Sequence, residues 1–206
     1  MGMDIRDLFY ILPAVIIILT VHEYSHAKVS DMLGDPTPRS SGRLTLNPLA
    51  HIDPLGLLML VLVRLGWAKP VPTSPMYYRD RKRGILYTAL AGPASGVFIA
   101  IISRAVMMSG VTSPYGTAFS FFSVLYYYSL VISVFNLLPV YPLDGSRILQ
   151  GLLPDNKWYR LIQYQNQLQI VFMLVIFLAG RLLWAFLNPA IAALDFAITR
   201  VLAMFL

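Results

Sequence analysis

The chain has 206 residues, of which 57% are hydrophobic and 13% are charged. Soluble domains carry about twice that charged share, so the composition excludes an ordinary soluble protein and indicates one that lies in a membrane. The net charge of +6 does not indicate nucleic-acid binding, because the lysines and arginines lie in loops between apolar runs. With no cysteine in the chain, a transition metal would need His, Asp or Glu ligands.

Apolar segments follow one another along the chain, at residues 8–33, 55–67, 85–108, 119–138, 168–187 and 189–206. A straight membrane span needs about 20 residues, so the first, third, fourth and fifth are expected to cross the bilayer. The second is short and flanked by Pro54 and Pro70, which favours a re-entrant or hairpin segment. The last contains Asp195 and Arg200 and is expected to lie along the membrane interface. We predict an all-α polytopic membrane protein with about five to six membrane segments, including the short one, in a single domain over residues 1–206.

The charges of two loops predict the orientation in the membrane. Arg79–Arg83 is the densest cationic stretch, and cationic loops tend to stay in the cytoplasm. The connection Ser109–Thr117 carries no charge and fits the opposite side. The first span is therefore expected to run inward from an external N-terminus, and the expected localisation is the cell membrane.

The sequence His22-Glu23-Tyr24-Ser25-His26 lies near the end of the first apolar run. On a helix, this H-E-x-x-H pattern places two imidazoles one turn apart, where both can bind one Zn²⁺, and places the Glu to take a proton from an attacking water. The alternative is that these residues only hydrogen-bond within a helix bundle. Ionisable side chains inside a membrane helix are costly and usually functional, which favours the metal site. At 1.5 Å per residue the motif lies about 10–15 Å from the expected helix end, nearer the cytoplasm.

Two histidines need at least a third metal ligand from elsewhere in the chain. The candidates are Asp31, His51, Asp53 and Asp144. Asp144 stands out because it follows the fourth apolar segment, on the side where the first helix places its histidines. Pro139 and Pro142 break the helix before it, which lets a carboxylate turn into the bundle.

Further segments occur in a characteristic order with this motif: Asn47–Gly56, Gly66–Pro72, Ala91–Pro93 and Asn136–Gly145. From about residue 20 to residue 154, the chain resembles site-2 proteases, a family of intramembrane zinc metalloproteases. The similarity identifies residues 20–154 as the core and leaves residues 168–206 as C-terminal membrane segments. No PDZ or CBS domain, as some relatives carry, accompanies this core. Gly96 departs from the pattern, because many relatives have Asn there.

The resemblance implies that His22, His26 and Asp144 bind one zinc ion per chain. It also implies that Glu23 is the catalytic base and that Asn136 positions the substrate or stabilises an oxyanion. For His51 two interpretations remain open, a role next to the zinc ligands or in substrate binding, and a structural role in its loop. Asp53 is expected to cap or orient the same turn.

The function expected is that of an intramembrane zinc endopeptidase that cleaves a peptide bond in or near a transmembrane helix of a membrane-bound protein. Its partners are then a transmembrane substrate and the lipid bilayer, with no nucleic acid. An extended segment from 43–47 or 71–78 is a further candidate for holding an unwound substrate. Two alternatives are a transporter of metal ions or solutes that uses the His/Asp cluster, and a non-catalytic relative that binds membrane helices.

Overall fold

The structure is a computed structural model and describes residues 5–63 and 66–205. Within these ranges the regular secondary structure is helical, apart from one isolated antiparallel bridge between Ile52 and Ala68. The helices are α1 (Ile5–Met32), α2 (Thr37–Ser40), α3 (Pro54–Val63), α4 (Arg81–Met108), α5 (Thr117–Asn136), α6 (Asp144–Leu152), α7 (Asp155–Ile162), α8 (Gln165–Leu178) and α9 (Gly180–Leu202), with short 3-10 turns η1 (Pro48–Ala50) and η2 (Pro75–Tyr77). The predicted all-α fold is confirmed.

In the described part of the chain, α1, α4, α5 and α9 are long and apolar enough to cross a membrane. The shortest of them, α5, has 20 residues, which corresponds to about 30 Å of helix, the thickness of the hydrocarbon core. The prediction of spans in the first, third and fourth apolar segments is therefore confirmed. The protein is an integral membrane protein.

The prediction of a span over residues 168–187 is wrong. A single span over 168–187 does not form, because the backbone leaves the helical conformation at Ala179 (φ −128°, ψ 30°). The long helix is α9, which includes Pro189 and the predicted interfacial segment. Its Asp195 is accommodated because the Tyr126 hydroxyl of α5 donates a hydrogen bond of 2.5 Å to it.

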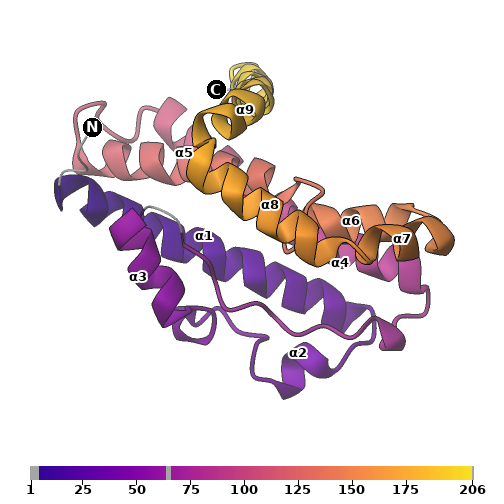
Figure 1. The fold of residues 1–206 in the computed structure, drawn as a ribbon. Helices are drawn as coiled ribbons and strands as arrows, with labels where there is room; N and C mark the ends of the chain where they lie inside the picture. The colour runs from indigo at the N-terminus through magenta and orange to yellow at the C-terminus, as the bar shows by residue number, and fades with distance from the viewer. Residues whose placement is uncertain (1–4, 64–65, 206) are drawn as a thin grey trace.

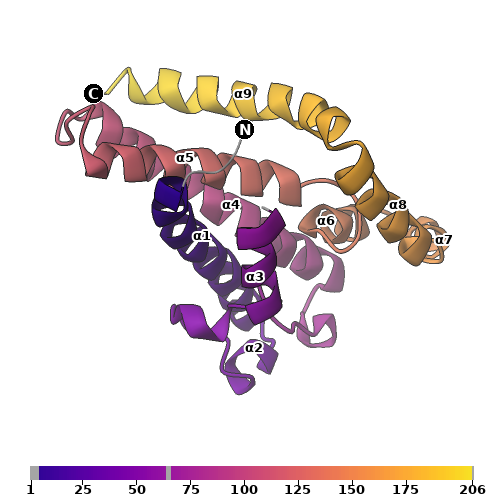
Figure 2. The ribbon, with the colours of Figure 1, turned by 60° about the vertical axis from the view of Figure 1, so that its left-hand side comes forward.

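Two apolar clusters hold the long helices together. Ala14 and Ile18 of α1 pack with Ile99 and Leu125 of α4 and α5. On the other side of α5, a second cluster joins α4, α5 and α9 through Ala100, Tyr126, Leu130, Leu187, Ile191 and Ile198. Figure 2 shows α9 running beside α5, with its C-terminal end near the turn between α4 and α5. The result is a bundle in which α4 is packed against both α1 and α5.

Gly96, the position that departs from the pattern, faces Ser133 of α5. A Cβ at Gly96 would lie 2.2 Å from the Ser133 hydroxyl and 3.4 Å from the carbonyl oxygen of Ser129. Small residues are common where membrane helices meet. A larger residue at position 96 would need the Ser133 side chain to rotate away.

The predicted hairpin is confirmed around α3, which lies beside α1 in Figure 1. With 10 residues, α3 is about 15 Å long, half of what a membrane crossing needs. Asp53 accepts hydrogen bonds of 2.9 Å from the backbone N–H groups of Leu55 and Gly56, which caps the helix. The Ile52–Ala68 bridge brings the returning chain back to the hairpin's start.

Candidate metal centre

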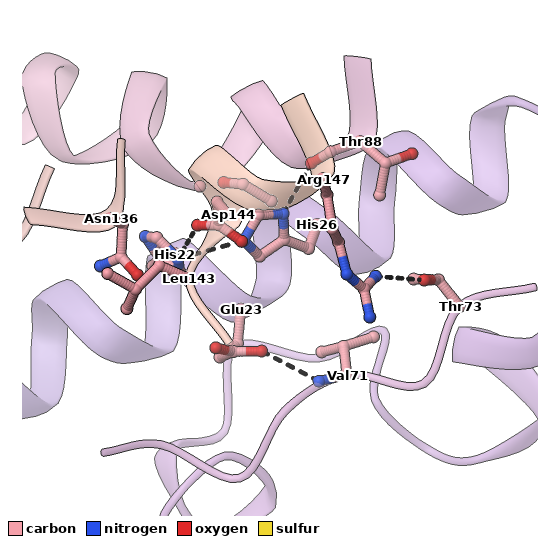
Figure 3. A network of polar contacts seen from close by, with 12 residues as sticks. His22, Glu23, His26, Val71, Thr73, Thr88, Asn136, Leu143, Asp144 and Arg147 are labelled. Carbon is pink, nitrogen blue, oxygen red and sulfur yellow. Dashed lines mark hydrogen bonds and ion pairs between the residues drawn. The ribbon is translucent and has the colours of Figure 1, made fainter. Parts of the chain in front are cut away.

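The two motif histidines lie one turn apart on α1 and are both buried, with exposed fractions of 5% and 8%. His26 Nδ1 lies 2.6 Å from the carbonyl oxygen of Thr88 on α4. A carbonyl can only accept a hydrogen bond, so Nδ1 donates and the lone pair of a neutral ring is left on Nε2. The Nε2 atoms of His22 and His26 lie 3.0 Å apart, and Figure 3 shows the two rings facing the same point.

Asp144 meets these histidines from the first residue of α6. Its Oδ2 atom is 3.0 Å from His22 Nε2, and its Oδ1 atom is 3.2 Å from His26 Nε2. The chain reaches this point by a tight turn after α5, in which a Cβ at Gly145 would overlap the carbonyl oxygens of Leu137 and Leu138. The glycine next to Asp144 thus allows the turn to fold close enough for the carboxylate to reach α1.

The donor set fits a zinc ion. His22, His26 and Asp144 each offer a ligand atom, and these atoms all lie within 4.8 Å of one another. Tetrahedral zinc with bonds of about 2.0–2.1 Å places neighbouring ligand atoms about 3.3 Å apart, close to the separations of 3.0 to 3.2 Å seen here. Asp144 Oδ2 is buried and makes no hydrogen bond of good geometry among the described residues, although His22 Nε2 is near. A cation between the imidazole nitrogens and the carboxylate would satisfy this arrangement.

Helix α4 leaves room for the cluster by means of a glycine. A Cβ at Gly92 would lie 2.5 Å from His22 Cε1 and 2.6 Å from His22 Nε2. Real Cβ atoms do not make such contacts, so any larger residue at position 92 would displace the imidazoles. The Ala91-Gly92-Pro93 segment of the sequence therefore lies directly against the metal centre.

Glu23 lies beside the cluster and points towards a different partner. Its Oε2 atom accepts a hydrogen bond of 3.0 Å from the backbone N–H of Val71. Figure 3 shows the Glu23 carboxylate on the side of the cluster that faces this backbone. The Glu23 side chain is half-buried, so part of it remains exposed beside the cluster.

The other predicted site residues lie outside the three-residue cluster. Asn136, at the end of α5, donates from Nδ2 to the carbonyl oxygen of Ile132 at 2.9 Å, and Figure 3 shows it close to His22. His51 Nε2 lies 2.8 Å from the carbonyl oxygen of Thr45. Asp53 caps α3, and Asp31 is held by two hydrogen bonds from Arg39. Of the four candidates for the third ligand, the structure brings only Asp144 to the histidines among the described residues.

Sequence reasoning did not predict that hydrogen bonds hold an extended segment across the site. This segment, residues 68–74, is called the strap below. Arg43, which is 7% exposed, donates to the carbonyl oxygens of Ala50 and, at 3.2 Å, Lys69. Arg147 donates to Thr73 Oγ1 at 3.1 Å. Prolines at 70, 72 and 75 were a signal for an extended backbone, but they did not indicate where it would lie.

The far end of the strap is held by Asp35, which is fully buried. Asp35 Oδ2 accepts hydrogen bonds from the Ser74 N–H at 2.6 Å and from Ser30 Oγ at 2.7 Å, and Oδ1 accepts one from the Thr37 N–H at 2.9 Å. Burial by itself raises the pKa of Asp35, but these hydrogen bonds outweigh it and hold the pKa below its usual value. Asp35 is therefore a carboxylate that anchors the strap.

The buried His-His-Asp cluster within a bundle of apolar helices defines a membrane-embedded metalloenzyme. Residues 107–180 match the family model "Peptidase family M50". The chain is 35% identical over 188 residues to "Putative zinc metalloprotease YwhC" of Bacillus subtilis, covering 87% of this chain and 86% of the relative. The chain belongs to peptidase family M50, the site-2 protease family, and it is a zinc metalloprotease.

More distant relatives carry similar names. The chain is 28% identical over 179 residues to "Putative zinc metalloprotease Rip2" of Mycolicibacterium smegmatis, covering 77% of this chain and 68% of the relative. It is 30% identical over 171 residues to the Rip2 protein of Mycobacterium tuberculosis, covering 80% and 64%. No solved structure matches the chain.

Proposed function

We propose that this zinc metalloprotease is an intramembrane endopeptidase that hydrolyses a peptide bond in or near a transmembrane helix of a membrane-bound substrate. In this proposal His22, His26 and Asp144 hold one zinc ion per chain, and Glu23 is the general base. The observation that carries the proposal is the convergence of three ligand atoms within 4.8 Å, buried at the end of an apolar span, next to a glutamate.

Each residue at the site has a defined part in this reaction. When bound, zinc supplies a Lewis acid that polarises a carbonyl group and lowers the pKa of a water. Glu23 accepts the proton of the attacking water and then delivers it to the leaving amine. The Thr88 carbonyl keeps His26 in the tautomer whose Nε2 lone pair faces the cluster. Asn136, at the end of α5, is the proposed donor that shares the charge developing on the substrate's carbonyl oxygen.

The site is proposed to lie nearer the cytoplasm than the middle of the membrane. His26 comes six residues before the end of α1, which corresponds to about 9 Å of helix. Helix α4 begins at Arg81, inside the cationic stretch Arg79–Arg83, and packs against α1. The positive-inside rule assigns this end of the bundle to the cytoplasm, and the protein is expected in the cell membrane.

A helical substrate has its backbone hydrogen bonds satisfied internally, so it must unwind locally before a peptide bond can be attacked. The strap offers an extended backbone beside Glu23, with the Val71 N–H directed at the Glu23 carboxylate. An unwound substrate segment would lie next to the strap to reach both Glu23 and the metal centre. In this arrangement a bound substrate would lie against the strap that hydrogen-bonds Glu23, so substrate binding would influence how the Glu23 carboxylate can move.

The proposal is tested with protein purified in detergent, by metal analysis and by cleavage of membrane-helix peptides. We expect about one zinc per chain, strongly reduced in His22→Ala, His26→Ala and Asp144→Ala. The matched control is Asp155→Ala, because the Asp155 side chain is 74% exposed and forms an ion pair with Lys82. Full zinc occupancy in Asp144→Ala would remove this residue from the ligand set. Zinc-loaded protein that moves ions across vesicles but cleaves no peptide would favour the transporter instead.

A further inference from the structure

A pocket lies between α1 and the hairpin that contains α3. Its walls are apolar and come from Ile16 and Leu19 of α1, from Leu57 and Leu60 of α3, and from Trp67 on the returning chain. The centre of a water-sized sphere can occupy about 20 Å³ of the pocket, little more than one such sphere needs. It is narrow, because a Cβ at Gly66 in its wall would lie 2.7 Å from Leu60 Cβ. The pocket therefore suits a small group rather than a large aromatic side chain.

Two polar atoms in the pocket's lining have no hydrogen-bond partner among the described residues. They are Nδ1 of His51 and Oγ1 of Thr20, in side chains that are 1% and 4% exposed. Buried polar groups are almost always paired, and leaving one unpaired is unfavourable. Two such atoms in the lining of one apolar pocket indicate that a ligand with its own polar group completes the site.

The chemistry of His51 determines which polar group this ligand needs. His51 Nε2 lies 2.8 Å from the Thr45 carbonyl oxygen, which can only accept, so Nε2 carries the hydrogen. In the neutral ring Nδ1 is then an acceptor and requires a donor. The Thr20 hydroxyl can donate or accept. A ligand hydroxyl has the hydrogen that His51 Nδ1 needs and a lone pair that Thr20 Oγ1 can use, whereas a carboxylate would offer no hydrogen to His51 and would lie near the Asp53 side chain in the same lining.

The pocket is close to the residues that carry out the reaction. Ile16 and Glu23 are seven residues apart on α1, two helical turns, so they lie on the same face of the helix. Ala68 lines the pocket, and Val71, three residues further along the strap, binds Glu23. In an extended chain three residues span about 10 Å. A substrate that runs along the strap would therefore place a residue within about three positions of the scissile bond at the pocket.

We propose that this pocket binds the side chain of a substrate residue within about three positions of the cleaved bond, and that it selects the small hydroxyl side chains of Ser and Thr. The inference rests on the proposed endopeptidase function and adds to it a determinant of substrate choice. His51 and Thr20 are specificity residues in this proposal and take no part in bond cleavage. A single ordered water in the pocket is the competing occupant that the experiment must distinguish.

The test uses the zinc-loaded full-length protein in detergent and a panel of single-span peptides with one common Leu/Ala helix. Each of the three positions on either side of the cleavage site, mapped by mass spectrometry, carries Thr, Ser, Val, Ala or Asp in turn. Val is the key comparison, because it has the shape of Thr without the hydroxyl. At one position we expect kcat/KM to be about tenfold higher for Thr than for Val, the usual effect of one hydrogen bond.

Variants at Thr20 and His51 test whether the preference for Thr over Val arises in the pocket. Thr20→Val retains the shape of Thr20 and breaks no hydrogen bond seen in the structure, so it should fold; we expect it to reduce the preference for Thr to about twofold or less. His51→Phe, which keeps a ring but no acceptor, should do the same. For each variant the measured quantity is the ratio of kcat/KM for the Thr peptide to kcat/KM for the Val peptide. The matched control is Thr112→Val, since Thr112 Oγ1 also lacks a partner among the described residues but lies outside the pocket.

The possible outcomes distinguish a failure of the pocket proposal from a failure of the proposed endopeptidase function. Cleavage of the panel that depends on Glu23 but shows no preference for a hydroxyl at any position would overturn the pocket's role and leave a water as its occupant. A hydroxyl preference that persists in Thr20→Val and His51→Phe would also overturn it. If the zinc-loaded protein cleaves no member of the panel, the proposed endopeptidase function fails before the pocket is reached.

Discussion

The Glu23 carboxylate and the Val71 backbone are joined by a hydrogen bond of 3.0 Å between positions 48 residues apart in the chain. The bond uses Oε2 and leaves Oε1 as the oxygen that can accept a proton. Pro70 and Pro72 flank Val71 and have no N–H groups, so Val71 supplies the donor in this part of the strap. The strap thus fixes the orientation of the proposed base through a backbone N–H group.

Replacing Glu23 with Gln tests the role of the carboxylate. Gln keeps the size of Glu, and its Oε1 atom can still accept the Val71 N–H, so the fold and the zinc content should be unchanged. The variant lacks a basic carboxylate, and we expect peptide hydrolysis to fall at least about 100-fold. Zinc analysis and initial cleavage rates of a membrane-helix peptide measure the two effects separately.

A trapped substrate provides a second measurement on the same variant. Glu23→Gln should still bind the peptide, which copurification after mild crosslinking would detect. If the variant with full zinc cleaves at nearly the parent rate, Glu23 is not the base. The transporter and the non-catalytic alternatives would then gain weight.

Gly92→Ala tests the metal centre without changing a ligand. Alanine normally stabilises a helix by about 1 kcal/mol relative to glycine, so a loss of function would not come from the helix itself. A Cβ at position 92 would lie 2.5 Å from His22 Cε1, which forces the imidazole away. We expect zinc affinity to fall by about 10- to 100-fold, as when a group that orients a ligand is lost.

The control for this substitution is Gly180→Ala at the start of α9, where an added Cβ meets nothing within 4 Å. Its zinc content and activity should equal those of the parent protein. Equal zinc affinity in Gly92→Ala would mean that the cluster can shift away from α4, contrary to the packing described above.

The convergence of the three side chains could be predicted from the sequence better than their surroundings. His22 and His26 follow from helical spacing, and Asp144 from its place after a span that ends on the same side. By contrast, the contact of Gly92 with the imidazoles depends on how α1 and α4 cross, which no local pattern encodes. The bond between Glu23 and Val71 depends in the same way on the path of a loop.

The surroundings of Asp195 in α9 depend on packing in the same way. Asp195 suggested an interfacial helix because a charge inside a span is costly. The cost is reduced by the Tyr126 hydroxyl and by Thr199 Oγ1, at 2.5 Å and 3.4 Å from Asp195 Oδ1. Tyr126 lies 69 residues earlier in the chain, so only the packed bundle reveals the pairing.

The orientation in the membrane can be tested with single cysteines, which is straightforward because the chain has none of its own. Arg81 is the first residue of α4, Ser113 lies in the connection after this helix, and both are exposed. In intact cells, a membrane-impermeant thiol reagent should label Ser113→Cys and leave Arg81→Cys unlabelled until the cells are opened. The reverse pattern would place the metal centre nearer the outside.

The pH dependence of stability should reveal the role of Asp35 in holding the strap. Its pKa in the folded protein is lowered, because the hydrogen bonds it accepts from Thr37, Ser74 and Ser30 outweigh its burial. A lowered pKa means that the carboxylate stabilises the fold above the unfolded value of about 3.9, and that this contribution is lost as the pH falls through the folded pKa. Asp35→Asn has one acceptor oxygen instead of two and cannot satisfy all of these donors. We expect it to unfold at a lower temperature than the parent at pH 7, with the difference shrinking at pH 3.

Thermal unfolding of both proteins in the same detergent, followed by circular dichroism, measures this difference. Asp155→Asn, at an exposed carboxylate, is the matched control and should unfold like the parent at both pH values. Because Asp35 anchors Ser74 and the strap leads from there to Val71, Asp35→Asn should also reduce peptide cleavage at pH 7 while retaining zinc. Parent-like unfolding and cleavage in this variant would show that Arg43 and Arg147 suffice to hold the strap beside Glu23.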